Sequence, residues 1–159
     1  MRLLLLGCSG FVGRELVPLL LELGHELTLV SRQLQPFPAL VGERLNCIQG
    51  DPADPSSWAG NGLELAVAQA DGVVNLAGEP IAERRWTPAH CELLRRSRVR
   101  STELLVAAMA RQQRPPAVLV NGSAVGYYGA SLQAQFSESS PAGSDFLAEI
   151  CQQWEAAAD

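Results

Sequence analysis

The 159-residue sequence contains no lysine, and all twelve of its basic residues are arginine. It also has no apolar run that approaches the ~18 residues a membrane span needs. Its four cysteines lie far apart with no C-x-x-C spacing, which predicts free thiols in a reducing cytoplasm and argues against a metal site or a disulfide framework. The net charge is −5, which argues against nucleic acid or an anionic membrane surface as a partner.

The rest of the composition suits one folded domain. Hydrophobic residues make up 47% of the chain, enough at this length to bury one sizeable core. Strand-like and helical segments alternate: we expect strands at 3–6, 27–30, 45–48, 72–76 and 118–120, and helices at 11–23, 63–70, 89–111 and 146–158. This alternation predicts a Rossmann-type α/β fold over residues 1–159, with a doubly wound parallel sheet of five strands in order 3-2-1-4-5 and helices on both faces.

The first expected strand runs directly into a glycine-rich turn with the spacing G-x-x-G-x-x-G. In such turns the first glycine permits the tight turn, the second lets the backbone approach a pyrophosphate, and the third lets the next helix pack on the strand. The N–H groups at the start of that helix then face the anion. The turn predicts a dinucleotide site formed by Gly7, Ser9, Gly10, Phe11, Val12 and Gly13, and an ordinary strand–helix turn with chance glycines is the alternative.

Residues after the next strands refine the expected cofactor. Ser31 and Arg32 stand where an Asp or Glu usually binds the ribose of NAD; a hydroxyl and a guanidinium suit a 2′-phosphate and favour NADP over NAD. A solvated surface position is the alternative for Arg32. Asp51 could accept from the adenine amino group or cap the turn ahead of Pro52. After the fourth strand, small residues would let the backbone pass close to the nicotinamide ribose: Leu76, Ala77 and Gly78.

Longer motifs make a resemblance specific. They are Asn75–Trp86, Ser97-Arg98-Val99 with Thr102, Ser123–Gly129, and Ser140-Pro141 through Cys151-x-x-Trp154-Glu155. With the glycine turn they resemble an atypical subgroup of the extended short-chain dehydrogenases/reductases, the NAD(P)-dependent epimerase/dehydratase family, whose members are also called nucleoside-diphosphate-sugar epimerases or cell division inhibitors. The resemblance implies an NAD(P)-binding domain. It also implies that residues 1–159 lack the later substrate-binding lobe and that the fifth strand is an exposed edge, which predicts self-association.

The resemblance also shows a departure from the ordinary catalytic pattern. Ordinary members use a Tyr-x-x-x-Lys pair with an upstream Ser or Thr, and the lysine lowers the pKa of the tyrosine so that its phenol can exchange a proton at neutral pH. This chain has no lysine, so the pair is missing. By the family's spacing from Ser123, Leu147 and Cys151 stand at the Tyr and Lys positions, and Arg98 stands where an Asn often supports the relay.

Five residues remain as candidates for catalysis: Ser123, Tyr127, Tyr128, Arg98 and Cys151. The Ser123 hydroxyl could polarise a substrate carbonyl at the end of the fifth strand, and either tyrosine could supply a phenolic proton. Packing is the alternative for the tyrosines and for Cys151, and a surface salt bridge is the alternative for Arg98. We expect Trp154 and Glu155 in the last helix to pack and pair rather than react.

Two functions stay open on these grounds. The first is the cofactor-binding part of an NADP-dependent oxidoreductase or epimerase that acts on a small-molecule substrate, a small or nucleotide-linked carbonyl or alcohol. The second is a non-catalytic NADP-binding module that senses cofactor state or regulates a partner. The missing Tyr-Lys pair favours the second, whereas Ser123 and the small residues at 76–78 favour the first.

Overall fold

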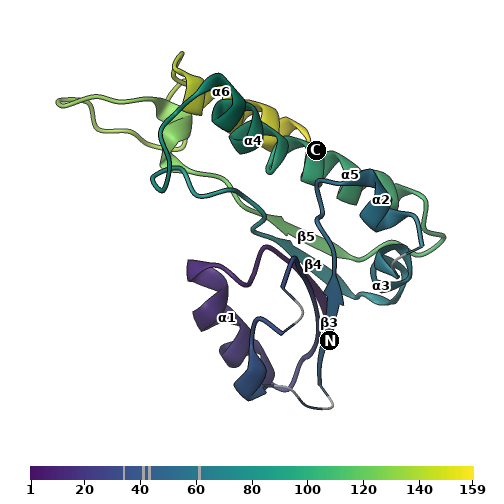
Figure 1. The fold of residues 1–159 in the computed structure, drawn as a ribbon. Helices are drawn as coiled ribbons and strands as arrows, with labels where there is room; N and C mark the ends of the chain where they lie inside the picture. Colours follow the sequence, from purple (N-terminus) through teal and green to yellow (C-terminus); the bar gives the residue numbers. More distant parts are fainter. Residues whose placement is uncertain (34, 41, 43, 61) are drawn as a thin grey trace.

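A computed structural model describes residues 1–33, 35–40, 42, 44–60 and 62–159. Its centre is one parallel sheet in the order β3-β2-β1-β4-β5 (Figure 1). The strands are β1 (Arg2–Leu6), β2 (Glu26–Ser31), β3 (Leu45–Gln49), β4 (Gly72–Asn75) and β5 (Val118–Asn121). The predicted Rossmann-type topology and strand order are therefore confirmed.

Helices cover both faces of the sheet (Figure 1). One face carries α1 (Phe11–Glu22), which connects β1 to β2. The other face carries α2 (Pro55–Trp58), α3 (Leu63–Gln69), α4 (Pro88–Arg96), α5 (Val99–Ala110) and α6 (Phe146–Ala156). Two short 3-10 helices, η1 (Pro38–Leu40) and η2 (Val125–Tyr128), lie in the connections.

The leucines of β1 explain why the sheet is buried on both sides. Leu4 and Leu6 pack with α3 and α5, whereas Leu5 points to the opposite face and packs with Val17 of α1. All three leucines are at most 1% exposed. Burial of a side chain of this size stabilises the fold by about 1.5–3 kcal/mol. Since alternate residues face opposite layers, an unbroken run of leucines is what a central parallel strand requires.

The structure corrects the single helix expected at 89–111. Two helices, α4 and α5, occupy this stretch and are separated at Ser97 and Arg98. The Ser97 hydroxyl and the Arg98 guanidinium both donate to the Leu94 carbonyl, at 3.1 and 3.2 Å. The same side chains bind the main chain of Glu79: its N–H donates to Ser97 Oγ (2.9 Å), and Arg98 Nη2 donates to its carbonyl (3.0 Å). Side-chain competition with the helix backbone thus ends α4 where the loop after β4 crosses it.

The connection from β2 to β3 has no crossover helix among its described residues. It contains η1 and a bridge between Gly42 and Leu45, while Val41 and Glu43 lie outside the described residues. The short helix α2 was not expected, although Asp54 caps it and Pro55 opens it, the usual signals of a helix start.

The strand β5 is an edge, as expected. Its Leu119 packs into the core, but Val118 and Val120 point to the α1 side of the sheet and are 45% and 53% exposed. Self-association through this edge stays a prediction. No helix within the described part of the chain is long and apolar enough to cross a membrane.

Candidate functional site

The glycine turn joins β1 to α1 at the carboxyl edge of the sheet. Gly7 has φ +71°, which favours glycine, and a Cβ there would overlap the main chain of Leu76 and Ala77. A Cβ at Gly13 would overlap the Cys8 carbonyl, so the third glycine lets α1 lie against the turn. At Gly10 the nearest atom to such a Cβ is the Gly7 carbonyl oxygen, 3.4 Å away. Gly7 and Gly13 are thus required by packing, and the space at Gly10 is left open.

A cavity of about 190 Å³ lies beside this turn and is lined by residues at the ends of β1, β2, β3 and β4 and by residues of α4. Eight of the predicted cofactor contacts line it: Gly7, Ser9, Gly10, Ser31, Arg32, Asp51, Ala77 and Gly78. Four do not. Phe11 and Val12 open α1 with exposed side chains, Gly13 packs on the turn, and Leu76 packs in the core on the α1 side. The structure thus brings eight of the twelve predicted cofactor contacts together around one cavity.

The polar residues of this cavity are already held by local hydrogen bonds. Ser31 Oγ accepts from the Gln33 N–H (3.0 Å), and Asp51 Oδ1 accepts from the Ala53 N–H (2.9 Å). Asp51 therefore caps the turn, as one of the two alternatives expected, and it also lines the cavity; its contact with an adenine amino group stays a prediction.

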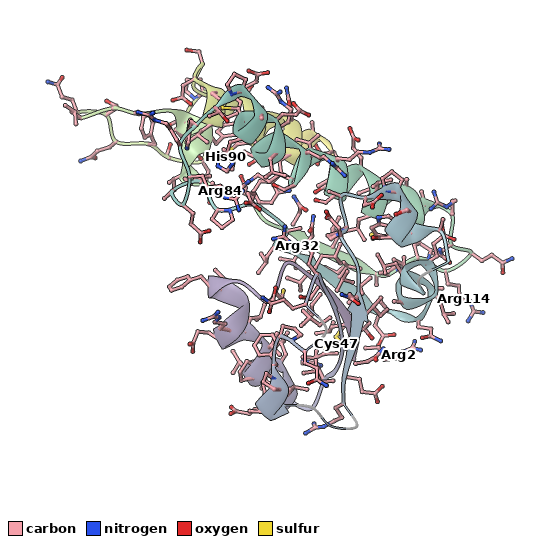
Figure 2. All side chains as sticks on the ribbon, in the orientation of Figure 1. Arg2, Arg32, Cys47, Arg84, His90 and Arg114 are labelled. Atoms are coloured by element: carbon pink, nitrogen blue, oxygen red, sulfur yellow. The ribbon has the colours of Figure 1, made fainter. Side chains whose placement is uncertain are left out.

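Two charged residues of the cavity were missed by the sequence reasoning. Glu79 is only 8% exposed, and its Oε2 lies 3.8 Å from Nη1 of Arg32. Arg96 of α4 lines the same cavity and donates to the Ala53 carbonyl (3.4 Å). Arg96 is the last residue of α4, directly before the break that was not expected. Figure 2 shows Arg32 near the middle of the molecule and Arg114 at its far end.

Arg98 links this cavity to the second part of the site. Its guanidinium binds the Glu79 carbonyl on one side and lies 5.5 Å from the ring of Trp154 in α6 on the other. A Cβ at Gly78 would come within 3.0 Å of the guanidinium, so the small residue makes room for it. Burial lowers the pKa of Arg98, although the nearby Cys151 and Glu79 oppose this. Arg98 is therefore not the surface salt bridge considered as its alternative role, because it is partly buried and holds the loop after β4.

The second part of the site lies after β5. Ser123, Tyr127 and Tyr128 line an open cavity of about 350 Å³ together with Glu138 and Glu155. The rings of Tyr127 and Tyr128 meet edge to face at 5.2 Å, and Tyr128 stacks on Phe136 at 5.3 Å. The tyrosines thus combine the packing role with a position on the cavity.

The helix α6 approaches this cavity through the residues that replace the Tyr-Lys pair. A Cβ at Gly126 would lie 3.5 Å from Cβ of Leu147 and 3.9 Å from Sγ of Cys151, which shows that η2 rests on this face of α6. Cys151 is buried, and burial raises the pKa of its thiol, with Glu155 raising it further and Arg98 opposing. A thiol in this state is a poor proton acceptor at neutral pH.

Glu155, one helical turn beyond Cys151, makes the contact that the sequence reasoning did not foresee. Ser123 Oγ donates to Glu155 Oε1. The expectation that Glu155 pairs is borne out, but its partner is the serine expected to act in catalysis. The spacing Cys-x-x-Trp-Glu on a helix opposite the end of β5 was the signal that could have found it.

A buried polar network holds α6 against the sheet. Thr102 Oγ1 accepts from Asn75 Nδ2 (2.9 Å) and from Trp154 Nε1 (3.1 Å), and Asn75 Nδ2 also donates to Asn121 Oδ1 (2.7 Å). The network ties β4, β5, α5 and α6 together directly beneath Ser123. No cluster of three or more potential metal ligands occurs among the residues that the structure describes.

Known proteins share sequence and fold with this chain. Residues 3–147 match the NAD dependent epimerase/dehydratase family. The Arabidopsis thaliana protein "Epimerase family protein SDR39U1 homolog, chloroplastic" is 36% identical over 167 residues, which cover 96% of this chain and 42% of that protein.

Two solved structures are similar as well. The human epimerase family protein SDR39U1, crystallised with NADPH, is 34% identical with a TM-score of 0.75 and covers 100% of this chain and 49% of its own. The nucleoside-diphosphate sugar epimerase from Corynebacterium glutamicum is 31% identical with a TM-score of 0.71 and covers 99% of this chain and 30% of its own. The chain thus spans about half the length, or less, of the relatives it matches.

Proposed function

The chain belongs to the NAD dependent epimerase/dehydratase family, and from that premise we propose that it binds NADP(H) and takes part in hydride transfer to or from a carbonyl or alcohol substrate. The observation that carries the proposal is the turn at residues 7–13, where packing requires Gly7 and Gly13 but leaves Gly10 open. An open backbone at the N-terminus of a 12-residue helix suits a pyrophosphate.

The residues around the turn fit this cofactor. The backbone N–H groups at Phe11 and Val12 would receive the pyrophosphate, Asp51 would accept from the adenine amino group, and the 2′-phosphate would bind Arg32. The nicotinamide ring supplies or accepts the hydride when the dinucleotide is bound. The chain's own task is then to orient a substrate oxygen and to exchange its proton.

The preference for NADP over NAD rests on Ser31 and Arg32. A guanidinium attracts a 2′-phosphate, whereas the carboxylate usual at this position in NAD-binding proteins would repel it. The NADPH in the human relative's structure supports the same choice. Glu79 opposes it, because its carboxylate lies 3.8 Å from Arg32 and competes with the phosphate for that guanidinium.

The substrate side of the proposal rests on Ser123. Its hydroxyl lines the cavity after β5 with two phenols beside it, where it would hydrogen-bond the oxygen of a carbonyl or alcohol. The matched relatives support a small or nucleotide-linked substrate, since one of them is called a nucleoside-diphosphate sugar epimerase.

A non-catalytic NADP-binding sensor is the second candidate. It is favoured by the replacement of the Tyr and Lys positions by Leu147 and Cys151, neither of which lowers the pKa of a phenol. Both candidates require dinucleotide binding, so binding alone does not separate them.

The deciding experiment measures two quantities on the purified protein. NADPH affinity is determined by fluorescence titration. NADPH oxidation is followed by the loss of absorbance of the reduced nicotinamide, with small ketones, aldehydes and nucleotide-linked keto-sugars as substrates. We expect NADPH to bind more tightly than NADH and at least one carbonyl to be reduced. Tight NADPH binding with no turnover on any of them would leave the sensor; no binding of either dinucleotide would refute both candidates.

A further inference from the structure

Ser123 has a carboxylate partner, Glu155, that comes from the last helix. Its Oγ donates to Oε1 of Glu155, and both side chains are exposed to the cavity after β5. The residues come from different elements, since Ser123 follows β5 and Glu155 lies in the last turn of α6. A contact between a serine hydroxyl and a carboxylate leaves the serine proton pointing at a group that can accept it.

The fold holds this contact in place through Trp154. The indole is 6% exposed and donates to Thr102 Oγ1, and a Cβ at Gly122 would come within 2.9 Å of its ring. The residue before Glu155 is thus locked against the residue before Ser123. Because both neighbours are fixed, the carboxylate and the hydroxyl meet at a defined distance, as a proton relay requires.

Glu155 lies on the same face of α6 as the residues at the usual Tyr and Lys positions. Leu147, Cys151 and Glu155 follow at intervals of four and therefore share one face of the helix. The contacts of Leu147 and Cys151 with the segment at Gly126 show that this face looks toward η2. The first two stand at the usual Tyr and Lys positions, where Leu147 has no ionisable group and Cys151 is a buried thiol, so the carboxylate on this face stands one turn later.

We propose that Glu155 exchanges the proton of Ser123, so that a serine–carboxylate pair replaces the Tyr-Lys pair. In the oxidation direction the substrate alcohol passes its O–H proton to Ser123 Oγ while the Ser123 proton passes to Glu155. The C–H bond of the alcohol carbon breaks, and its electron pair leaves as hydride to the bound nicotinamide dinucleotide, which is reduced as the alcohol is oxidised to a carbonyl. Glu155 ends protonated, and the reverse sequence returns the proton.

Glu155 acts through Ser123 and is a positioning residue that also holds the relayed proton. Other titratable groups face the pair: the Tyr127 and Tyr128 phenols and the Glu138 carboxyl across the cavity, and the Cys151 thiol one turn back on α6. Arg98 lies behind Cys151. The inference rests on the proposed function for its reaction, but the proton contact exists without cofactor or substrate and is tested without them.

The first experiment measures the reactivity of Ser123 in the absence of any dinucleotide. Purified protein is treated with phenylmethylsulfonyl fluoride, and the rate of Ser123 sulfonylation is measured by peptide mass spectrometry, with the exposed Ser131 as internal reference. Withdrawal of the serine proton raises its nucleophilicity. We expect Ser123 to react at least ten times faster than Ser131, Glu155→Gln to abolish this difference, and Glu155→Asp to retain part of it.

A matched control removes a carboxylate from the same helix. Glu149→Gln lies on α6 but pairs with Arg95 at the surface, so it should leave the labelling rate unchanged. Equal labelling of Ser123 in wild type and Glu155→Gln, or labelling of Ser123 no faster than that of Ser131, overturns the proposal.

The second experiment uses turnover with whichever carbonyl the wild type reduces. Glu155→Gln should lower kcat about 100-fold, within the usual contribution of a positioned acid or base, without changing NADPH affinity. The alkaline limb of the kcat/KM pH profile for carbonyl reduction, in which Glu155 must carry the proton that it returns, should disappear in the same variant, which a purely structural role would not produce. A profile that keeps this limb overturns the proposal.

The two experiments separate the failure of this inference from that of the proposed function. A protein that binds no dinucleotide but loses Ser123 labelling in Glu155→Gln retains the serine–carboxylate pair and refutes the proposed function. A protein that reduces a carbonyl with unchanged rate and pH profile in Glu155→Gln retains the proposed function and refutes the pair.

Discussion

The two ends of the candidate site differ in whether main chain or side chains form them. The dinucleotide end is made of main chain: a glycine turn, the start of α1 and the ends of β2 and β3. The Ser123 end is made of side chains that reach across from α5 and α6, with Trp154 and Thr102 at its base. The shape of a site formed by main chain depends mainly on the positions of its glycines. The chemistry of a site formed by side chains changes with every substitution on the helix face that lines it. The dinucleotide end is therefore recognisable in this sequence, although the usual Tyr-Lys pair is missing from the Ser123 end.

The largest expected effect comes from replacing Trp154, which supports the Ser123 end of the site. Trp154→Ala should destabilise the fold by about 3–5 kcal/mol, because a buried indole leaves a large cavity. Trp154→Phe keeps most of the ring but loses the bond to Thr102 and should cost about 1 kcal/mol. Urea unfolding measures both. Equal losses in the two variants would show that packing of the ring contributes little.

At the dinucleotide end, two glycine variants separate the packing of the turn from its access to a pyrophosphate. Gly13→Ala should destabilise the protein by about 3 kcal/mol, since its Cβ overlaps the Cys8 carbonyl. Gly10→Ala should cost less than about 1 kcal/mol, because its Cβ would approach only the Gly7 carbonyl oxygen, at 3.4 Å. The same Gly10 variant should nevertheless weaken NADPH binding. Urea unfolding and fluorescence titration together check the pair, and an undiminished NADPH affinity in Gly10→Ala would argue against a pyrophosphate there.

A smaller effect tests the proposed contact of Arg32 with a 2′-phosphate. Arg32→Asp should weaken NADPH binding about 10- to 100-fold through loss of a charge-assisted bond and leave NADH binding nearly unchanged. Glu79→Gln should strengthen NADPH binding, because it removes the carboxylate that competes for Arg32. Arg114→Asp makes the same charge change far from the cavity and serves as the control. Equal losses of NADPH and NADH affinity in Arg32→Asp would refute a 2′-phosphate contact.

A pH-dependent effect concerns Cys8, which lies in the glycine turn. Burial raises the pKa of its thiol from 9.0 to about 12. The unfolded chain therefore loses this proton first as pH rises, so the stabilising difference is complete below pH 9 and is lost between pH 9 and about 12. The free energy of unfolding should fall by up to about 1.4 kcal/mol per pH unit in that window. Urea unfolding of Cys8→Ala at pH 8 and pH 10 isolates the thiol, and an unchanged slope would contradict its burial as the cause.

The sequence predicts the first end of the site far better than the second. The glycine spacing identifies the turn, and the alternation of strands and helices predicts the sheet order, because both follow from local pattern. The break between α4 and α5 could not be predicted, since it depends on Ser97 and Arg98 meeting a loop 18 or 19 residues earlier in the chain. The same limit hides the contact of Ser123 with Glu155, because 32 residues separate the two and the packing of α6 brings them together.

The absence of lysine has a consequence for calorimetry of the dinucleotide cavity. Arg32 and Arg96 are the cations that line it among the described residues, and a guanidinium keeps its proton throughout the accessible pH range. Any proton taken up or released when NADPH binds there must come from a phosphate, whose second pKa lies near about 6, or from a carboxylate. Above pH 8, the binding enthalpy should therefore be the same in phosphate and Tris buffers, whose ionisation heats differ.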